Sequence, residues 1–423
     1  MDVTDTAQMY DRRLADAPED AHWNVSDAPE PRIHRIHGYP AKFPAFLTTK
    51  ALEYSRSLGN HPKRVADIFC GCGTVAQEAR REGLEFWGCD INPVATLIAR
   101  TKSANLRPAR IEQFMQKILQ CMPAQSNDAG LSHMATQRLQ RWFTPSRFEE
   151  LSQLLNAIRA AVPDRSAYRD VFYCAFSAIL KSCSQWRQRS IKPTFDYEKL
   201  PAEVETAFTN QCLLLIRAFA ELPQEGVTKR PEILQANVLT VPPPVPVDLI
   251  VTSPPYVTSY EYADLHQLSS LWLGYTEDHR SLRDGSIGSA QHSLNLRRDM
   301  RELNTVGTQV VFSLYNHNRR AAHAVANYYI DMQRVARRCL TFLAPRGLAV
   351  FVIGNTRYSG VDIDNAAHLT EALLDAGFSC VSAAKRTISN KAATPYRNGN
   401  GRFSREKTPN HIYDHEYVLI AHQ

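Results

Sequence analysis

The tetrapeptide Ser253-Pro254-Pro255-Tyr256 brings together a hydroxyl group, a rigid backbone and an aromatic ring. It directly follows the mostly apolar run 247–252, which we predict to be a buried strand that the two prolines end. Open α/β sheets bind ligands at the carboxyl ends of their strands. There the exocyclic amino group of a nucleobase could donate hydrogen bonds to the Ser253 hydroxyl and the Pro254 carbonyl, which would make its nitrogen more nucleophilic, while Tyr256 stacks on the base. A base in this site must be single-stranded or flipped out of a duplex.

A glycine-rich turn follows another predicted strand, 65–69. It reads Asp67-Ile-Phe69-Cys-Gly71-Cys-Gly73-Thr74 and leads into a predicted helix, 74–81. Glycines allow a tight turn and a close approach of the backbone to a ligand, and the start of the helix offers free N–H groups. We therefore predict that this turn binds a cofactor.

The type of cofactor is narrowed by an acidic residue near the end of the next predicted strand, 86–91. Asp90, in Gly88-Cys-Asp90-Ile91-Asn92-Pro93, could accept hydrogen bonds from both hydroxyl groups of a ribose. The third glycine of the dinucleotide-binding pattern is replaced by Gln77-Glu78-Ala79, whose Glu would repel a pyrophosphate, and the Walker pattern is absent. A nucleoside without phosphates, such as S-adenosylmethionine, fits this turn best.

Composition excludes several classes of protein. The 423 residues include 49 Lys and Arg against 43 Asp and Glu, and the net charge of +6 permits a polyanionic partner without requiring one. No apolar run approaches the ~18 residues of a membrane span and the N-terminus is polar and acidic, so we expect a cytoplasmic protein that does not contact a membrane. The nine cysteines include no Cys-x-x-Cys pair, so we expect reduced thiols and no bound metal.

Short apolar runs and helical patterns alternate along the chain and must position these residues. Strands are predicted at 65–69, 86–91, 233–238, 247–252, 348–354, 378–383 and 417–421, and helices at 74–81, 93–104, 323–343 and 366–376. This alternation is typical of a doubly wound α/β fold with a mostly parallel sheet.

Two regions depart from the alternation. Residues 2–30 carry eight acidic and two basic residues, and we expect residues 1–30 to be a solvated, flexible leader. Residues 105–230 contain three apolar stripes at helical spacing and no convincing strand, which predicts an inserted helical subdomain. The main domain would then be formed by 31–104 and 231–423.

Taken in order, these motifs resemble those of S-adenosylmethionine-dependent DNA amino-methyltransferases, which act on cytosine N4 or adenine N6. Asp67–Thr74 is similar to the cofactor motif of that family, and Asp90-Ile91-Asn92-Pro93 to its ribose-binding motif. The resemblance covers residues 33–104 and 233–422. It implies a Rossmann-like methyltransferase fold, with a seven-stranded sheet that contains one antiparallel strand, and S-adenosylmethionine as the cofactor.

The resemblance also implies roles for residues outside these two motifs. His37-Gly-Tyr39-Pro-Ala-Lys42-Phe43 resembles the N-terminal motif that closes over the methionine end of the cofactor. Asn237 lies where family members often carry an acidic residue near the adenine amino group, and it departs from that pattern. His266, in the segment after the tetrapeptide, is expected to be structural or to line the base pocket.

Serine at the first position of the tetrapeptide is typical of the N4-cytosine branch, because adenine enzymes usually carry Asp or Asn there. We therefore expect a DNA methyltransferase that modifies N4 of a flipped cytosine in a restriction–modification or defence system. Its partners would be DNA and a cognate restriction endonuclease or other defence proteins. Two alternatives remain: transfer to adenine N6 or to RNA, and a non-catalytic DNA-binding subunit. Methylation of cytosine C5 is not expected, because no Pro-Cys dipeptide supplies its nucleophile.

Charge predicts where DNA would bind. Residues 385–411 carry seven basic residues and one acidic residue, and the implied sheet would place this loop beside Ser253. Its cations could neutralise phosphates, and we expect DNA contacts from Lys391, Arg397, Arg402, Arg405 and Lys407. A second candidate face on the insertion comprises Arg138, Arg141, Lys181, Arg187, Arg189 and Lys192, with Trp142 and Trp186. Target recognition by the insertion, by residues 284–320 or by the basic loop remains open.

Overall fold

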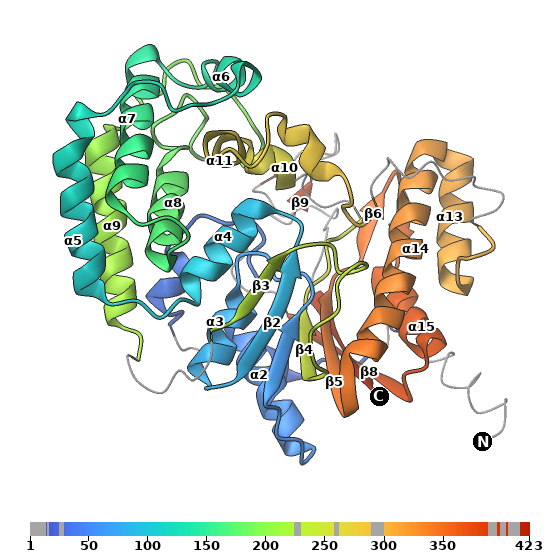
Figure 1. The fold of residues 1–423 in the computed structure, drawn as a ribbon. Coiled ribbons are helices and arrows are strands. Elements are labelled where there is room, and N and C mark those ends of the chain that lie inside the picture. Colours follow the sequence, from blue (N-terminus) through green and yellow to red (C-terminus); the bar gives the residue numbers. More distant parts are fainter. Residues whose placement is uncertain are drawn as a thin grey trace, which may run out of the picture.

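A computed structural model describes residues 14, 17–24, 29–223, 230–257, 262–288, 300–387, 396–397, 403–404 and 415–423. At its centre lies a seven-stranded sheet in the order β3-β2-β1-β4-β5-β11-β8 (Figure 1). The strands are β1 (Arg64–Asp67), β2 (Glu85–Asp90), β3 (Glu232–Gln235), β4 (Val247–Thr252), β5 (Leu343–Ile353), β8 (Cys380–Thr387) and β11 (His415–His422).

One strand of this sheet runs against the others. β11 pairs antiparallel with both β5 and β8, whereas the pairs that β1, β2, β3, β4 and β5 form with one another are parallel. This topology confirms the predicted Rossmann-like methyltransferase fold, a doubly wound, mostly parallel seven-stranded sheet with one antiparallel strand. All seven predicted strands are present, and β4 has the predicted bounds. β1 ends two residues earlier than predicted, because Ile68 and Phe69 already belong to the turn.

Both faces of the sheet are buried, which explains why several of its strands, such as β4 and β5, are mostly apolar. Successive side chains of a strand point to opposite faces, so Val65 and Leu249 pack on one side while Ala66 and Ile250 pack on the other. Two helices cover the first side, α2 (Ala45–Ser57) and α3 (Thr74–Arg81). Three helices cover the second side, α13 (Thr305–His317), α14 (Arg319–Phe342) and α15 (Asn365–Ala376).

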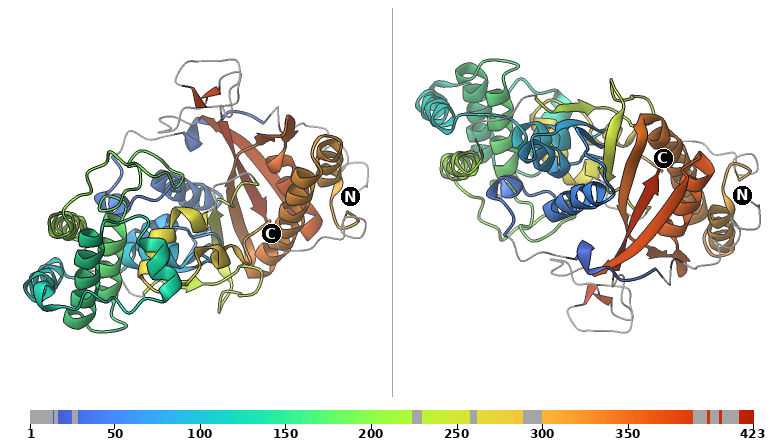
Figure 2. Two further views of the ribbon diagram at one scale, coloured as in Figure 1. Left: turned by 90° about the horizontal axis from the view of Figure 1, so that it is seen from above. Right: turned by 90° about the horizontal axis from the view of Figure 1, so that it is seen from below.

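The region predicted to be an inserted helical subdomain is helical. Its helices are α5 (Pro108–Cys121), α6 (His133–Leu139), α7 (Pro145–Ala161), α8 (Ala167–Ile179) and α9 (Val204–Ala220). They share a core of their own, which also takes in side chains of α4 (Pro93–Lys102) and α11 (Gln267–Trp272). Figure 2 shows these helices at the opposite end of the molecule from α13, α14 and α15. The domain boundaries proposed above remain predictions.

The N-terminal leader differs from expectation in the part that the structure describes. Residues 17–24 are only partly solvated: Pro18, Glu19 and Ala21 are exposed, but Trp23 is only 1% exposed and packs against the core on the α2 side of the sheet. Backbone hydrogen bonds join Pro18 and Asp20 to Lys385 of β8, at 2.9 and 3.0 Å. The acidic composition of the leader did not indicate this contact, because only one large apolar residue, Trp23, holds the segment to the core. None of the helices within the described ranges has the length and apolar character of a membrane span.

Candidate active site

The turn after β1 requires its glycines. Gly73 has a φ of 75° and precedes α3, and a Cβ atom on it would lie 2.6 Å from the Cα of Ala99. Gly71 has a φ of 45°, and its N–H donates to Oδ2 of Asp90 at 2.9 Å. The backbone therefore passes so close to α4 that a residue with a Cβ atom would not fit at position 73. A hydrogen bond also holds the turn to the carboxylate of Asp90 at the end of β2.

Two carboxylates lie at this edge of the sheet, the buried Asp67 and the half-buried Asp90. Asp90 accepts hydrogen bonds from the N–H groups of Gly71 and Asn92, and burial raises its pKa to about 6. Asp67 accepts from the Thr252 hydroxyl at 2.7 Å and from the Phe69 N–H, and burial raises its pKa to about 7. Asp67 thus joins the glycine turn to the last residue of β4, directly before Ser253.

Tyr39 reaches the glycine turn from the N-terminal motif. A Cβ atom on Gly71 would lie 3.5 Å from the Tyr39 hydroxyl oxygen, and the Tyr39 ring stacks on Tyr262 and on His266. Nδ1 of His266 lies 2.8 Å from Nδ2 of Asn92, which donates, so the ring proton of His266 is on Nε2. Burial lowers the pKa of His266 to about 3, so the ring is neutral near pH 7. His266 therefore has a structural contact with Asn92, and a role in lining the base pocket stays a prediction.

Asn92 has a second role. Its side-chain oxygen accepts from the N–H groups of Val94 and Ala95 and so caps α4, while its amide nitrogen donates to His266. The capped helix start lies between Asp90 and the segment that follows the tetrapeptide. Thr74 is buried at the start of α3, and Ile91 is half-buried directly after Asp90.

The remaining residues predicted to contact the cofactor have partners within the chain. His37 is hydrogen-bonded to Ser177 of α8 at 2.9 Å, and Lys42 donates to Glu30 at 2.6 Å. Phe43 packs against the core on the α2 side of the sheet. Asn237 donates to the Gly285 carbonyl at 2.9 Å. The structure therefore brings Tyr39 to the glycine turn but gives these four residues contacts elsewhere, and their role toward a cofactor stays a prediction.

Ser253 lies directly after β4, at the carboxyl edge of the sheet. Its hydroxyl donates to the Val352 carbonyl of β5 at 2.8 Å. Since the only hydroxyl proton is used in this bond, the Ser253 oxygen can act toward a ligand only as an acceptor. Pro254 has no N–H, so its backbone likewise offers only an acceptor, the carbonyl.

Tyr256 is held in place by Gly354 and Glu416, two residues to which the sequence analysis gave no role. The ring of Tyr256 lies against Gly354, where a Cβ atom would come within 3.3 Å of Cε2, and its hydroxyl donates to Glu416 at 3.3 Å. Glu416 is held in turn by Arg386, only 4% exposed, at 2.6 Å. β8 extends to Thr387, so Lys385 and Arg386 belong to the sheet and not to the basic loop in which we counted them. The opposite charges of Arg386 and Glu416 could have indicated that these residues pair in adjacent strands. The predicted strand 378–383 ended too early to include Arg386.

The basic loop leaves and rejoins the sheet at this same edge, where Thr387 pairs with His415. Arg397 lies in the short strand β9 (Tyr396–Arg397), which pairs with β10 (Phe403–Ser404). The other four predicted DNA contacts, Lys391, Arg402, Arg405 and Lys407, lie outside the described residues.

The candidate face on the insertion changes in composition. Arg138 forms a bidentate ion pair with Asp278, Lys181 donates to the Ser190 carbonyl at 2.7 Å, and Trp186 is 2% exposed. These three side chains stabilise the fold instead of facing solvent.

Within the described ranges, His, Cys, Asp and Glu side chains do not gather in a group of three that could hold a metal ion.

Comparison with known proteins shows distant similarity to methyltransferases. The chain is 22% identical over 369 residues to the type II methyltransferase M.MvaI of Kocuria varians, covering 80% of each chain. It is 21% identical over 406 residues to M.BsoBI of Geobacillus stearothermophilus, covering 82% of this chain and 78% of that one. It is 22% identical over 360 residues to M.AvaI of Nostoc sp., covering 75% and 73%. No protein-family model matches the chain.

Among solved structures, the rRNA methyltransferase aviRa from Streptomyces viridochromogenes aligns over 97% of this chain and 95% of its own, with 11% identity and a TM-score of 0.30. That score is too low to support a conclusion. The type II relatives and the fold, considered together, support a methyltransferase, and they imply S-adenosylmethionine as its cofactor.

Proposed function

We propose that the chain is a DNA methyltransferase that transfers a methyl group from S-adenosylmethionine to the N4 amino group of a flipped cytosine. It would act as the modification enzyme of a restriction–modification or defence system, with DNA and a cognate endonuclease or other defence proteins as partners. The observation that carries the proposal is the Ser253 hydroxyl. It sits at the carboxyl end of β4 with its proton donated to Val352, and Asp67 links the end of β4 to the glycine turn.

The donor and acceptor set of the turn fits S-adenosylmethionine. Each carboxylate oxygen of Asp90 uses one lone pair on a backbone N–H and keeps another for a ribose hydroxyl. Gly73 lets the turn pass close to Ala99 of α4, and Gly71, beside the Tyr39 hydroxyl, would let a ligand approach the backbone with Tyr39 over it. When bound, S-adenosylmethionine supplies a methyl group on a positively charged sulfur, which a nucleophilic nitrogen can attack.

Residues at the end of β4 would prepare the attacking amino group. Ser253 Oγ and the Pro254 carbonyl are both acceptors, so each could take one N–H of the amino group and make its nitrogen more pyramidal. Tyr256, fixed by Glu416 and Gly354, would stack on the flipped base. Alignment of this kind contributes up to ~7–11 kcal/mol in well-oriented reactions. After transfer, the surplus proton on nitrogen can leave to water, so no general base is required.

The choice of N4 over N6 rests on the serine of the tetrapeptide, which resembles the N4-cytosine branch. Incubation with methyl-labelled S-adenosylmethionine and mixed-sequence duplex DNA, followed by digestion to nucleosides, tests it. We expect label in N4-methylcytosine. Label in N6-methyladenine would correct the base, and label only in a parallel RNA reaction would correct the substrate. If no nucleoside carries label while calorimetry still detects cofactor binding, the chain is a non-catalytic subunit.

A further inference from the structure

We propose that the hairpin Gln185–Leu200, which follows α8, contacts the phosphate backbone of duplex DNA beside the target base. This assignment rests on the proposed function and adds a DNA-contacting element to it. The hairpin is defined by one bridge between Trp186 and Phe195. It carries Arg187, Arg189 and Lys192 of the insertion's basic face, which are exposed, as is Arg141 outside the hairpin.

The hairpin is braced, so that its tip is presented in one orientation. Backbone hydrogen bonds cross it from Arg187 to Thr194 and from Asp196 to Gln185, both at 2.8 Å. Two lysine side chains also hold the hairpin by hydrogen bonds to its backbone and to α8's end: Lys181 donates to the Ser190 carbonyl, and Lys199 donates to the carbonyls of Lys181 and Trp186. A braced element loses less conformational entropy when it binds than a floppy loop would.

A series of four aromatic side chains runs from the buried Trp186 at the base of the hairpin to the exposed Tyr197. Trp142 stacks on Trp186 with ring centroids 5.3 Å apart and lies 5.9 Å from Phe195, which in turn is 4.5 Å from Tyr197. Tyr197 is 89% exposed and Leu200 is 92% exposed. Trp186 belongs to the core of the insertion, whereas Tyr197 and Leu200 do not. Exposed aromatic surface beside cations is what nucleic-acid interfaces use.

The charge of the tip favours a phosphate partner. From 185 to 195 the sequence contains Arg187, Arg189 and Lys192 and no Asp or Glu. Arg187 lies 3.5 Å from Asp196, whereas Arg189 and Lys192 are exposed and have no acidic side chain within 4 Å among the described residues. The cores of protein–protein interfaces are depleted in such charges, whereas phosphate contacts require them.

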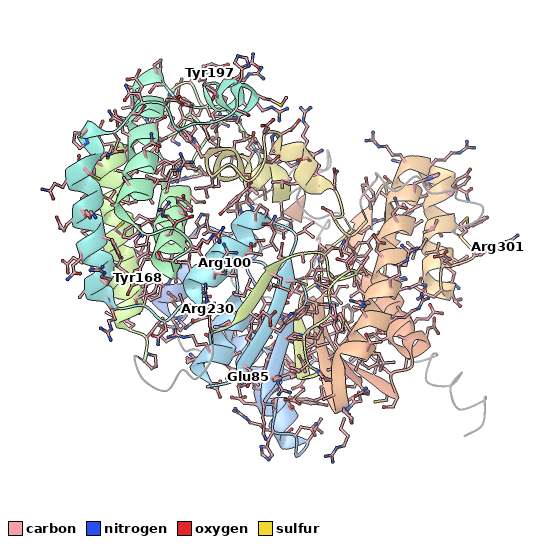
Figure 3. All side chains as sticks on the ribbon, in the orientation of Figure 1. Glu85, Arg100, Tyr168, Tyr197, Arg230 and Arg301 are labelled. Atoms are coloured by element: carbon pink, nitrogen blue, oxygen red, sulfur yellow. The ribbon has the colours of Figure 1, made fainter. Side chains whose placement is uncertain are left out.

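The hairpin lies on the side of the molecule toward which the carboxyl edge of the sheet points. Figure 3 labels Tyr197 at the top, the side toward which the parallel strands point and on which α10 (Tyr262–Leu265) and α11 follow the tetrapeptide. α8 connects the two, because its Ser177 is hydrogen-bonded to Ser269 of α11 at 2.7 Å and to His37. A duplex whose base enters the site would therefore extend past the hairpin.

The test compares two double variants that remove the same charge. Arg189→Ala/Lys192→Ala changes the tip, and Lys63→Ala/Arg346→Ala changes two exposed cations at the opposite, amino edge of the sheet. Binding of the full chain to a fluorescent duplex is measured by anisotropy at several salt concentrations, and cofactor binding by calorimetry. We expect the tip variant to bind DNA about tenfold more weakly, with a salt slope smaller by about 1.8, because two phosphate contacts are lost. Cofactor affinity should stay unchanged.

Three outcomes would overturn the assignment. If the tip variant binds as the control variant does while the wild type methylates DNA, only the hairpin assignment fails. If the wild type neither binds nor methylates duplex DNA, the proposed function fails with it. If an RNA hairpin displaces the duplex from the wild type and the tip substitutions weaken only RNA binding, the partner is RNA.

Discussion

Ser253 illustrates how a single hydrogen bond can set the chemistry of a side chain. By donating to Val352, its hydroxyl becomes an acceptor toward the ligand side of the sheet. We predict that Ser253→Ala lowers the methyl-transfer rate on the order of 100-fold, the loss typical of removing one group that orients or polarises the reacting centre, while cofactor affinity changes little.

A matched control for this variant is Ser152→Ala. Ser152 in α7 also donates its hydroxyl to a backbone carbonyl, that of Phe148 at 2.9 Å, but it lies in the core of the insertion. Single-turnover kinetics and calorimetry are measured on both. Equal rates for the wild type and Ser253→Ala would remove Ser253 from the reaction.

The raised pKa of Asp90 makes a prediction about pH. An ordinary Asp would remain ionised well below pH 6, but burial raises the pKa of Asp90 from 3.8 to about 6. The ionised form is the better acceptor for ribose hydroxyls, so cofactor affinity should fall as pH drops through about 6. The apoprotein should respond in the opposite sense: the shift costs stability as pH rises from 3.8 to about 6, because the unfolded chain ionises first.

Calorimetry across this pH window tests the assignment to Asp90. Asp90→Asn should bind the cofactor more weakly at every pH and lose the inflection near 6. Asp248→Asn, at the amino edge of the sheet where Asp248 accepts from Lys63 and Arg64, should keep it. An inflection that persists in Asp90→Asn would point to Asp67, whose pKa is raised to about 7.

At the scale of elements, the glycine turn shows that space and backbone angle are separate requirements. Gly73 and Gly83 both have φ values above 70°, but a Cβ atom would lie 2.6 Å from Ala99 at position 73 and meet nothing within 4 Å at position 83. We predict that Gly83→Ala costs about 1 kcal/mol of unfolding free energy and Gly73→Ala about 1–3 kcal/mol more, with loss of cofactor binding. Urea unfolding and calorimetry measure both effects. Equal costs at the two positions would show that the contact with α4 relaxes.

Elements that carry their own signal could be predicted from the sequence. β4 was predicted at its observed bounds because an apolar run ends in two prolines, and α3 because glycines precede it and its helical pattern is regular. β5 begins five residues before the predicted start, because Leu343 directly follows α14 and continues the chain without a turn residue.

Contacts between distant segments could not be predicted in this way. Tyr256 and Glu416 are 160 residues apart, and His37 and Ser177 are 140 apart. Each of these pairs forms only when the sheet order and the insertion are in place. The local pattern of apolar and polar residues therefore cannot predict these contacts. The tetrapeptide and Asp90 were recognisable because the chemistry of each is contained in a few adjacent residues.

For the whole molecule, the net charge of +6 is a sum of unlike parts. Residues 385–411 carry a surplus of six positive charges, of which Lys385 and Arg386 belong to β8. The loop that follows β8 is anchored at Thr387 and His415, beside Tyr256. We predict that replacing Arg397, Arg402 and Arg405 by Ala weakens DNA binding and lowers its salt slope by up to about 2.7, without changing cofactor affinity. The control replaces Arg56, Lys63 and Arg346, which lie near the amino ends of the strands. If both variants bind DNA alike, the loop's charge serves only solubility.

The contact between the leader and β8 has a consequence for self-association. β8 is an outer strand of the sheet, and such strands present unpaired backbone groups on which another molecule can add a strand. Pro18 and Asp20 occupy the groups of Lys385, and Asn24 accepts from the Thr387 N–H at 2.9 Å. A chain shortened to begin at residue 31 would keep every motif yet open this edge. We expect it to form aggregates that grow with concentration in light scattering, where the full chain does not.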